Sequence, residues 1–244
     1  MMTFQHRRFT LIELLVVIAI IAILAGMLLP ALGSVKARGN TVTCMSNQKN
    51  CIYALTGYAD SNEDFYPASL CNYGSRINVG WPYILTVEGY LPKQTESAAV
   101  IRCPLPVNRA DPSKNRLDYY VNREAGVFGM VQGTAGMGKE TYSGSGVYHV
   151  RRSNLAKADY KEVPLGGDSV STNWCRQESV IERLMPSTAN RGLVSSSNHK
   201  AVHLRHLKKA NLFFADGHVS AFAAKDITPG TYVVYALNVL NSAY

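Results

Sequence analysis

The sequence predicts an α+β protein in which one long N-terminal helix packs on a small antiparallel sheet. An apolar run near the N-terminus passes into an amphipathic stretch of helical periodicity at residues 33–59. Near the other end of the chain, an Asp-Gly dipeptide stands between two short apolar runs, which is a strong hairpin signal. The apolar residues that recur at helical spacings in the amphipathic stretch are Val35, Val42, Met45, Ile52, Leu55 and Ala59.

The composition excludes several classes of protein. The 244 residues are 47% hydrophobic and 17% charged, whereas disordered chains combine low hydrophobicity with high charge. The 25 Lys and Arg residues outnumber the 17 Asp and Glu residues and give a formal charge of +8. These basic residues are spread along the chain without a dense run, so we expect no nucleic-acid binding.

The first element is a segment able to cross a membrane. A short basic stretch, residues 1–8, precedes the apolar residues 9–32. As a helix, these 24 residues would be about 36 Å long, enough for a hydrocarbon core of about 30 Å. A buried core helix would be shorter and amphipathic, and an ordinary signal peptide has an apolar run of about 7–15 residues. Glu13 is the informative exception, because a charge within a membrane segment usually has a partner.

The stretch FTLIELLVVIAIIAIL, residues 9–24, resembles the prepilin-type cleavage and methylation segment of type IV pilins and of type II secretion pseudopilins. The resemblance implies that a prepilin leader peptidase cuts between Arg8 and Phe9 and methylates the new N-terminus at Phe9. It also implies an assembly role for Glu13 and a helix kink at Pro30. The family has Gly immediately before the cut, and Arg8 departs from that pattern.

The assembly role implied for Glu13 has a physical reason. After cleavage, the free amine of Phe9 would lie in an apolar bundle of helices, where the Glu13 carboxylate of a neighbouring copy would neutralise it. Two buried charges are costly alone and tolerable together, which favours a staggered packing of copies. The alternative is a Glu13 side chain that reaches toward the membrane surface without such a partner.

The sharpest C-terminal signal is the hairpin predicted at residues 210–222, with Asp216 and Gly217 as a two-residue turn. This turn would pair Phe213 with Ser220. The residues that this pairing places on the face toward the core are Leu212, Phe214, Val219 and Ala221.

His206 lies ten residues before Asp216, and this spacing with Gly217 resembles the H-x9-DG region of many prepilin-like envelope proteins. The residue types of His206, Asp216 and His218 would suit a metal ion or acid–base chemistry. However, the turn already explains Asp216, and a strand face shared with Asn211 explains His218. We therefore expect no metal ligands, no cofactor and no catalytic residues.

The five cysteines are Cys44, Cys51, Cys71, Cys103 and Cys175. An exported domain would permit disulfides. Cys44 and Cys51 stand seven residues apart on one expected helix, about 10 Å along it, beyond the reach of a disulfide at about 7 Å between α-carbons. We expect Cys44 to pair with Cys103, with buried free thiols as the alternative.

The expected organisation is a leader peptide at 1–8, a transmembrane and assembly helix at 9–32, an amphipathic helix at 33–59 and a globular domain at 60–244. The chain would cross the inner membrane once, with the N-terminus in the cytoplasm and the globular domain outside it. The expected function is structural: a subunit of a pilus-like or type II secretion pseudopilus-like filament. Its partners would be the leader peptidase and methyltransferase, other pilin or pseudopilin subunits, and inner-membrane lipid.

Two other functions are compatible with the sequence. In the first, the chain is a membrane-anchored extracytoplasmic binding module that forms no filament, and its glycine-rich residues 124–147 recognise a glycan or an envelope partner. In the second, it is a metal-dependent envelope enzyme. Replacing Glu13 would abolish assembly of a filament subunit but not binding by a module, and metal analysis with and without His206 tests the enzyme.

Overall fold

The computed structural model describes residues 10–73, 76–92, 100–105, 128–131, 138–140, 148–155, 164–171, 180–181, 200–226 and 234–235. The expected leader peptide, with Arg8 and the methylation position Phe9, lies outside these residues, as does Cys175. The chain divides into two compact units, Met1–Gly39 and Asn40–Tyr244, and each is described by itself.

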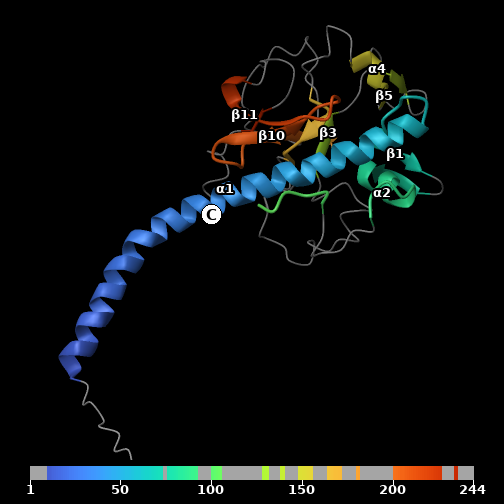
Figure 1. The fold of residues 1–244 in the computed structure, drawn as a ribbon. Helices are drawn as coiled ribbons and strands as arrows, with labels where there is room; N and C mark the ends of the chain where they lie inside the picture. Colours follow the sequence, from blue (N-terminus) through green and yellow to red (C-terminus); the bar gives the residue numbers. More distant parts are fainter. Residues whose placement is uncertain are drawn as a thin grey trace, which may run out of the picture. The chain divides into compact units, whose positions relative to one another are not determined.

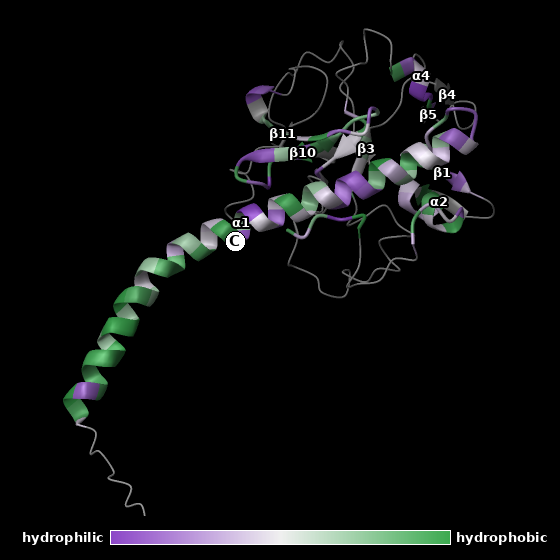
Figure 2. Cartoon of the chain, in the orientation of Figure 1, coloured by the Kyte–Doolittle hydropathy of each residue, from purple (hydrophilic) through white to green (hydrophobic). Residues whose placement is uncertain are grey.

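Helix α1 (Leu11–Ser61) is the first element and continues through Pro30 (Figure 1). Its first half is coloured as strongly apolar in Figure 2. The large apolar side chains from Leu11 to Leu32 are 47% to 77% exposed within the chain. In the part of the chain that the structure describes, α1 is the one helix long and apolar enough to cross a membrane. The expected membrane segment is therefore a helix whose large apolar side chains are exposed within the first unit that the structure describes.

The buried face of α1 begins at Cys44, in the second unit. The expected apolar face is right at Ile52, Leu55 and Ala59, which are buried. It is wrong at Val42, which is 67% exposed, and Val35, which precedes the second unit, is 63% exposed. The residues of α1 that are buried are Cys44, Gln48, Cys51, Ile52, Ala54, Leu55 and Ala59.

Several small sheets follow α1 in the part of the second unit that the structure describes. The largest has the order β11 (Val219–Ala223), β10 (Lys209–Phe213), β6 (Gly166–Gly167), β3 (Gly129–Val131) and β8 (Val180–Ile181). A second has the order β12 (Val234–Tyr235), β9 (Lys200–His203) and β7 (Ser169–Ser171). The remaining pairs are β1 (Leu70–Tyr73) with β2 (Arg76–Gly80) and β4 (Gly138–Glu140) with β5 (Tyr148–Val150).

Short helical elements accompany these sheets: α2 (Trp81–Val87), α4 (Arg152–Leu155) and the 3-10 helix η2 (Ala224–Asp226). The strand pairs are antiparallel except for β3 with β8 and β9 with β12, which are parallel. A long N-terminal helix with small, mainly antiparallel sheets confirms the α+β, pilin-like fold class.

The hairpin of β10 and β11 lies where the Asp-Gly dipeptide predicts it, but the predicted register is wrong by one residue. Phe213 pairs with Val219 and not with Ser220. The N–H of Phe214 donates to the carbonyl oxygen of His218 at 3.0 Å, and Gly217 has a φ of +87°. The loop therefore has three residues and ends with a glycine in the left-handed region, a common alternative to the two-residue turn.

This one-residue shift exchanges the two faces of β11. Because directly paired residues share a face, Val219 and Ala221 lie on the side of Phe213 and not of Phe214. His218 instead stacks its ring on Phe214, with the ring centroids 4.1 Å apart. The predicted grouping of Val219 and Ala221 with Leu212 and Phe214 is therefore wrong, although Val219 does pack against the core, and the predicted position of His218 beside Asn211 is wrong too.

The second half of α1 and the five-stranded sheet share one hydrophobic core. Trp81 is fully buried, and its indole N–H donates to the carbonyl oxygen of Phe128 at 3.1 Å. Two polar side chains of α1 bind the hairpin directly. Nε2 of Gln48 donates to the carbonyl oxygen of Asn211 at 3.0 Å, and Nζ of Lys49 donates to that of Gly217 at 2.5 Å. The bond of Gln48 gives its buried amide N–H group a partner, which helps to explain how α1 buries a glutamine.

Candidate assembly segment and a buried cysteine, aspartate and histidine cluster

Glu13 belongs to a capping box at the first turn of α1. Its Oε2 accepts hydrogen bonds from the backbone N–H of Thr10 at 2.8 Å and from the Thr10 hydroxyl at 2.7 Å. The N–H of Glu13 donates to the Thr10 hydroxyl oxygen at 3.2 Å. This Thr-x-x-Glu arrangement satisfies N–H groups that a helix end otherwise leaves without partners. Within one chain, Glu13 therefore caps a helix, a role that the Thr10–Glu13 spacing could have predicted.

The apolar run after Glu13 has no charged or hydroxyl-bearing side chain from Leu14 to Gly33. Pro30, the predicted kink, lies inside α1 and supplies no backbone N–H. The kink itself stays a prediction. A continuous apolar surface of this size calls for cover by lipid or by other chains, because apolar area exposed to water costs roughly 25 cal/mol per Å².

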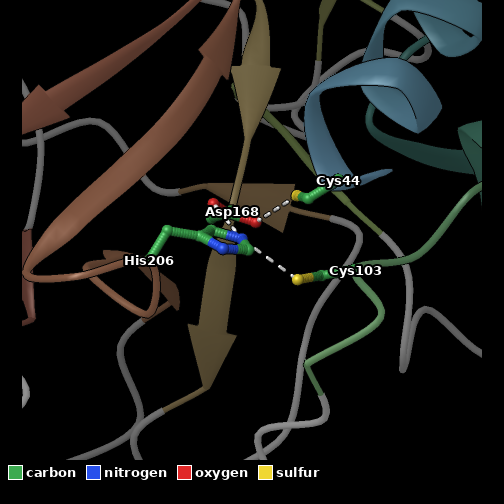
Figure 3. A group of neighbouring side chains, drawn as sticks. All are labelled: Cys44, Cys103, Asp168 and His206. Atoms are coloured by element: carbon green, nitrogen blue, oxygen red, sulfur yellow. Dashed lines mark hydrogen bonds and ion pairs between the residues drawn. The ribbon is translucent and has the colours of Figure 1, made fainter. Parts of the chain in front are cut away.

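Four side chains with metal-binding or acid–base chemistry meet in the second unit: Cys44, Cys103, Asp168 and His206 (Figure 3). All four are buried, and each brings one sulfur, nitrogen or oxygen atom within 4.8 Å of the others. They come from α1, from residues 100–105, from the junction of β6 and β7, and from the turn between β9 and β10. We call this group the buried cluster.

Short contacts connect the members of the buried cluster. Sγ of Cys44 lies 3.4 Å from Oδ1 of Asp168. Sγ of Cys103 lies 3.2 Å from Nε2 of His206, and the same nitrogen lies 3.4 Å from Oδ2 of Asp168. In Figure 3, both sulfur atoms and the imidazole ring point toward one small region beside the carboxylate. The four groups therefore form one connected polar site inside an apolar core.

A glycine pair places Asp168 in the buried cluster. Strand β6 lies between β3 and β10, and a Cβ atom at Gly166 would lie 2.3 Å from the carbonyl oxygen of Gly129. Gly167 has a φ of +154°, and a Cβ atom there would lie 2.4 Å from the carbonyl oxygen of Asn211. Glycine permits both the close approach and the backbone angle. The N–H of Asn211 then fixes the carboxylate by donating to Oδ2 at 2.8 Å.

A tight turn places His206. Its N–H donates to the carbonyl oxygen of Lys209, and the N–H of Lys209 donates to that of His206, both at 2.9 Å. The two residues between them, Leu207 and Lys208, have φ values of +51° and +65°. Two consecutive positive φ angles are typical of a type I′ turn, in which Asn and Gly are the favoured residues. The turn that fixes His206 therefore holds Leu207 and Lys208 in a backbone conformation that residues other than Gly and Asn rarely adopt.

Further donors surround the sulfur atoms and the carboxylate. The N–H of Leu105 points to Sγ of Cys103 at 3.4 Å, and Nε2 of Gln48 lies 3.6 Å from the other sulfur atom. Nε of Arg205 lies 3.9 Å from Oδ1 of Asp168, and the Arg205 side chain is 4% exposed. These N–H donors and the buried guanidinium of Arg205 therefore stabilise negative charge in the buried cluster.

Mutual contacts shift the pKa values of the buried cluster. Burial would lower the pKa of His206, but hydrogen bonds with Asp168 and Cys103 outweigh it and raise the pKa to about 9. Burial would raise the pKa of the Cys103 thiol, but contacts with Cys44 and His206 lower it to about 6. Burial also opposes ionisation of Asp168, yet His206 and Arg205 hold its pKa below the ordinary value. These shifts favour a protonated imidazole beside an ionised carboxylate, and they favour the thiolate form of Cys103.

The structure separates residues that the C-terminal spacing groups together. Asp216 and His218 form an exposed pair at the hairpin loop, with Nδ1 of His218 2.6 Å from Oδ1 of Asp216. His206 instead joins the buried cluster, where Cys44 and Cys103 also meet. Both cysteines carry free thiols there, and their disulfide stays a prediction.

Sequence reasoning missed Asp168 and, with it, the buried cluster as a group. The available signal was the sequence Gly166-Gly167-Asp168, in which two glycines directly precede an acidic residue. Glycine inside a strand indicates a close approach of another backbone, which the structure shows for both glycines. We expected no metal ligands from the sequence, but the structure brings together four residues whose donor atoms suit a metal ion.

The comparisons with known proteins concern the N-terminal segment. A family model described as the prokaryotic N-terminal methylation motif matches residues 9–29. No curated protein and no solved structure matches the chain. The matched residues include Glu13 and most of the exposed apolar half of α1. The chain thus carries the N-terminal methylation motif of a type IV pilin-like prepilin, on a helix that fits a single-pass membrane anchor.

Proposed function

We propose that this chain is a structural subunit of a pilus-like or type II secretion pseudopilus-like filament that assembles through the apolar half of α1. One observation carries the proposal. The methylation motif at residues 9–29 lies on a helix whose large apolar side chains are 47% to 77% exposed. Such a surface suits a lipid bilayer before assembly and the apolar helices of neighbouring subunits afterwards.

In this proposal, a prepilin leader peptidase removes residues 1–8 and methylates Phe9. Residues 9–32 then cross the inner membrane once, with the N-terminus on the cytoplasmic side. The amphipathic helix at 33–59 leads into an extracytoplasmic globular domain at 60–244. The positive charges of Arg7 and Arg8 before the apolar run are consistent with this orientation, because basic residues favour the cytoplasmic side.

Glu13 would contact the amine of Phe9 in a neighbouring copy. In a single chain, the carboxylate accepts two hydrogen bonds from Thr10, both at Oε2. An ionised carboxylate offers about four lone-pair sites, so the cap and an amine of another chain can both be served. A hydrogen bond to an ionised amine is also stronger than one between neutral groups. The cap would therefore orient Glu13 for the contact between copies.

Intact mass and N-terminal sequencing of the protein from membranes test the processing. A chain that starts at methylated Phe9 supports the proposal. A start at Met1 or Met2 would mean that Arg8 blocks the cut, which favours a permanently anchored binding module. A start near Ser34 would mean an ordinary signal peptide and would remove the filament.

Two variants separate the charge of Glu13 from its capping role. Glu13→Gln keeps a capping box, because Gln also serves at this position, but it removes the charge. Thr10→Ala removes the two hydroxyl contacts of the cap, leaves the backbone N–H of residue 10 on Glu13, and keeps the charge. We expect Glu13→Gln to abolish sedimentable filaments at an unchanged level of membrane-bound subunit, and Thr10→Ala to retain filaments. Normal filaments from Glu13→Gln would contradict the electrostatic contact.

A further inference from the structure

We propose that Cys44, Cys103, Asp168 and His206 bind one Zn²⁺ ion in a tetrahedral, structural site. The proposal concerns the second unit and does not depend on filament assembly. Two sulfur donors, one oxygen and one nitrogen converge in the core from segments that are far apart in the chain. Asp168 follows Cys44 by 124 residues, and His206 follows Cys103 by 103 residues.

Three contacts within the buried cluster are close to the donor spacings of a tetrahedral zinc site. With Zn–S bonds of about 2.3 Å and Zn–N or Zn–O bonds of about 2.0 Å, neighbouring donor atoms lie about 3.3–3.8 Å apart. Oδ1 of Asp168 lies 3.4 Å from Sγ of Cys44, its Oδ2 lies 3.4 Å from Nε2 of His206, and that nitrogen lies 3.2 Å from Sγ of Cys103. All four donor atoms lie within 4.8 Å of one another. Small side-chain rotations would therefore place them around one ion.

The donor types favour zinc over the other common divalent ions. Calcium and magnesium prefer oxygen ligands, whereas two thiolates and an imidazole suit zinc. Two thiolates and one carboxylate around Zn²⁺ leave a single negative charge on the site. The guanidinium of Arg205, whose Nε lies 3.9 Å from Oδ1 of Asp168, offsets that charge in the core. The occupied site is thus electrically balanced without a further ion.

Hydrogen bonds around the buried cluster also suit metal-bound ligands. The N–H of Leu105 lies 3.4 Å from Sγ of Cys103, and the amide of Gln48 lies 3.6 Å from Sγ of Cys44. The N–H of Asn211 holds the carboxylate of Asp168 at 2.8 Å. Partners of this kind orient the ligands of metal sites and stabilise their charged forms. Three of the four proposed ligands therefore have a supporting donor in place.

The proposed site is closed and has a structural role. Four protein donors fill a tetrahedral zinc ion, and all four residues are buried, whereas catalytic zinc keeps a position for water or substrate. The ion would fasten α1 to residues 100–105, to the end of β6 and to the turn between β9 and β10. Loss of zinc should therefore loosen the contact of α1 with the sheet in the second unit.

The competing state is a disulfide between Cys44 and Cys103. Its formation removes one hydrogen atom from each thiol, and neither sulfur atom then remains a thiolate ligand. A zinc-bound chain keeps its full mass and yields both thiols after chelation in denaturant. The two states therefore differ in metal content, in mass and in the number of free thiols.

Metal analysis of the full-length protein, purified in detergent without chelators or reductants, tests the proposal. We expect one zinc ion per chain in the wild-type protein and in Cys51→Ser, a control that changes a buried α1 thiol outside the cluster. Cys103→Ser and His206→Gln should each lower the zinc content at least tenfold. A wild-type chain without zinc, or unchanged zinc in both variants, would overturn the proposal.

X-ray absorption at the zinc edge of the wild-type protein does not depend on the folding of any variant. We expect two sulfur atoms at about 2.3 Å and two nitrogen or oxygen atoms at about 2.0 Å. A shell of nitrogen and oxygen alone would show zinc bound elsewhere and would overturn the proposal. A zinc-free chain that is lighter by two hydrogen atoms would identify the disulfide and would overturn it as well.

Discussion

The two halves of α1 place apolar side chains in opposite surroundings. From Leu11 to Leu32, the large apolar side chains are 47% to 77% exposed within the chain. From Cys44 to Ala59, the inward face is buried, and Ile52 and Leu55 are 0% exposed. The two halves belong to one continuous helix. The apolar surface of the first half calls for cover by lipid or by other chains, whereas the inward face of the second half is covered within the second unit.

The difference shows that hydrophobicity alone does not decide what a helix packs against. The first half has no charged side chain from Leu14 to Gly33, so every direction around the helix axis is apolar. The second half buries a polar residue, Gln48, and two thiols, because the sheet and loops supply partners for them. The first half is therefore suited to lipid or a bundle, and the second to one specific set of neighbours.

The largest expected effect comes from truncating a leucine in the covered half. Leu55→Ala removes a fully buried side chain, so we expect the free energy of unfolding of the second unit to fall by about 2–5 kcal/mol. The matched control, Leu24→Ala, changes a 56% exposed side chain on the same helix and should leave that free energy nearly unchanged. Urea unfolding in detergent, followed by tryptophan fluorescence, measures both. Equal losses would contradict the contrast between the two halves.

A smaller effect on the free energy of unfolding is expected at Asp64, shortly after the end of α1. Burial raises the pKa of Asp64, but the N–H of Ser153 and the guanidinium of Arg152 outweigh it and hold the pKa below the ordinary value. Because the folded-state pKa is the lower one, this stabilisation is present above the unfolded-state pKa and is lost as pH falls through the folded value. Asp64→Asn should therefore lower the free energy of unfolding by about 1 kcal/mol at neutral pH.

Urea unfolding between about pH 7 and about pH 2 tests this prediction at Asp64. The difference between wild type and Asp64→Asn should shrink as the pH is lowered. Asp60→Asn is the control. Asp60 contacts the same Arg152, but its side chain is 59% exposed, so its replacement should change the free energy of unfolding less than Asp64→Asn does. A difference that stays constant across the pH range would contradict the assignment.

The smallest effect concerns the turn that carries His206. Leu207→Asn with Lys208→Gly places the residues favoured in a type I′ turn at two positions with positive φ. We expect the free energy of unfolding to rise by about 0.5 kcal/mol, because relieved backbone strain exceeds the added flexibility of the unfolded chain. The same urea titration measures it. A loss of stability would mean that Leu207 or Lys208 makes a contact that outweighs the strain.

Local patterns predicted the parts of the fold that depend on neighbouring residues. The apolar run and the helical spacing of Ile52, Leu55 and Ala59 were enough for α1, because both are properties of one segment. The Asp-Gly dipeptide located the hairpin but not its register. The register depends on whether the loop has two or three residues, and Asp-Gly fits both kinds of loop.

The buried cluster could not be predicted because its members are brought together by pairings between distant segments. Asp168 reaches the site only because β6 lies between β3 and β10, and no local pattern specifies that strand order. Cys44 and His206 were both singled out in the sequence, but they were assigned to different features. Tertiary contacts of this kind are fixed by packing and not by local propensity.

The bond between Gln48 and Asn211 sets an order of events during translation. The two residues are 163 positions apart, so at about 5–20 residues per second Gln48 leaves the ribosome roughly 8 to 33 s before its acceptor does. Strand β10, which carries Asn211, also separates β11 from β6 in the sheet. The core of the second unit therefore cannot be complete until the hairpin of β10 and β11 has emerged.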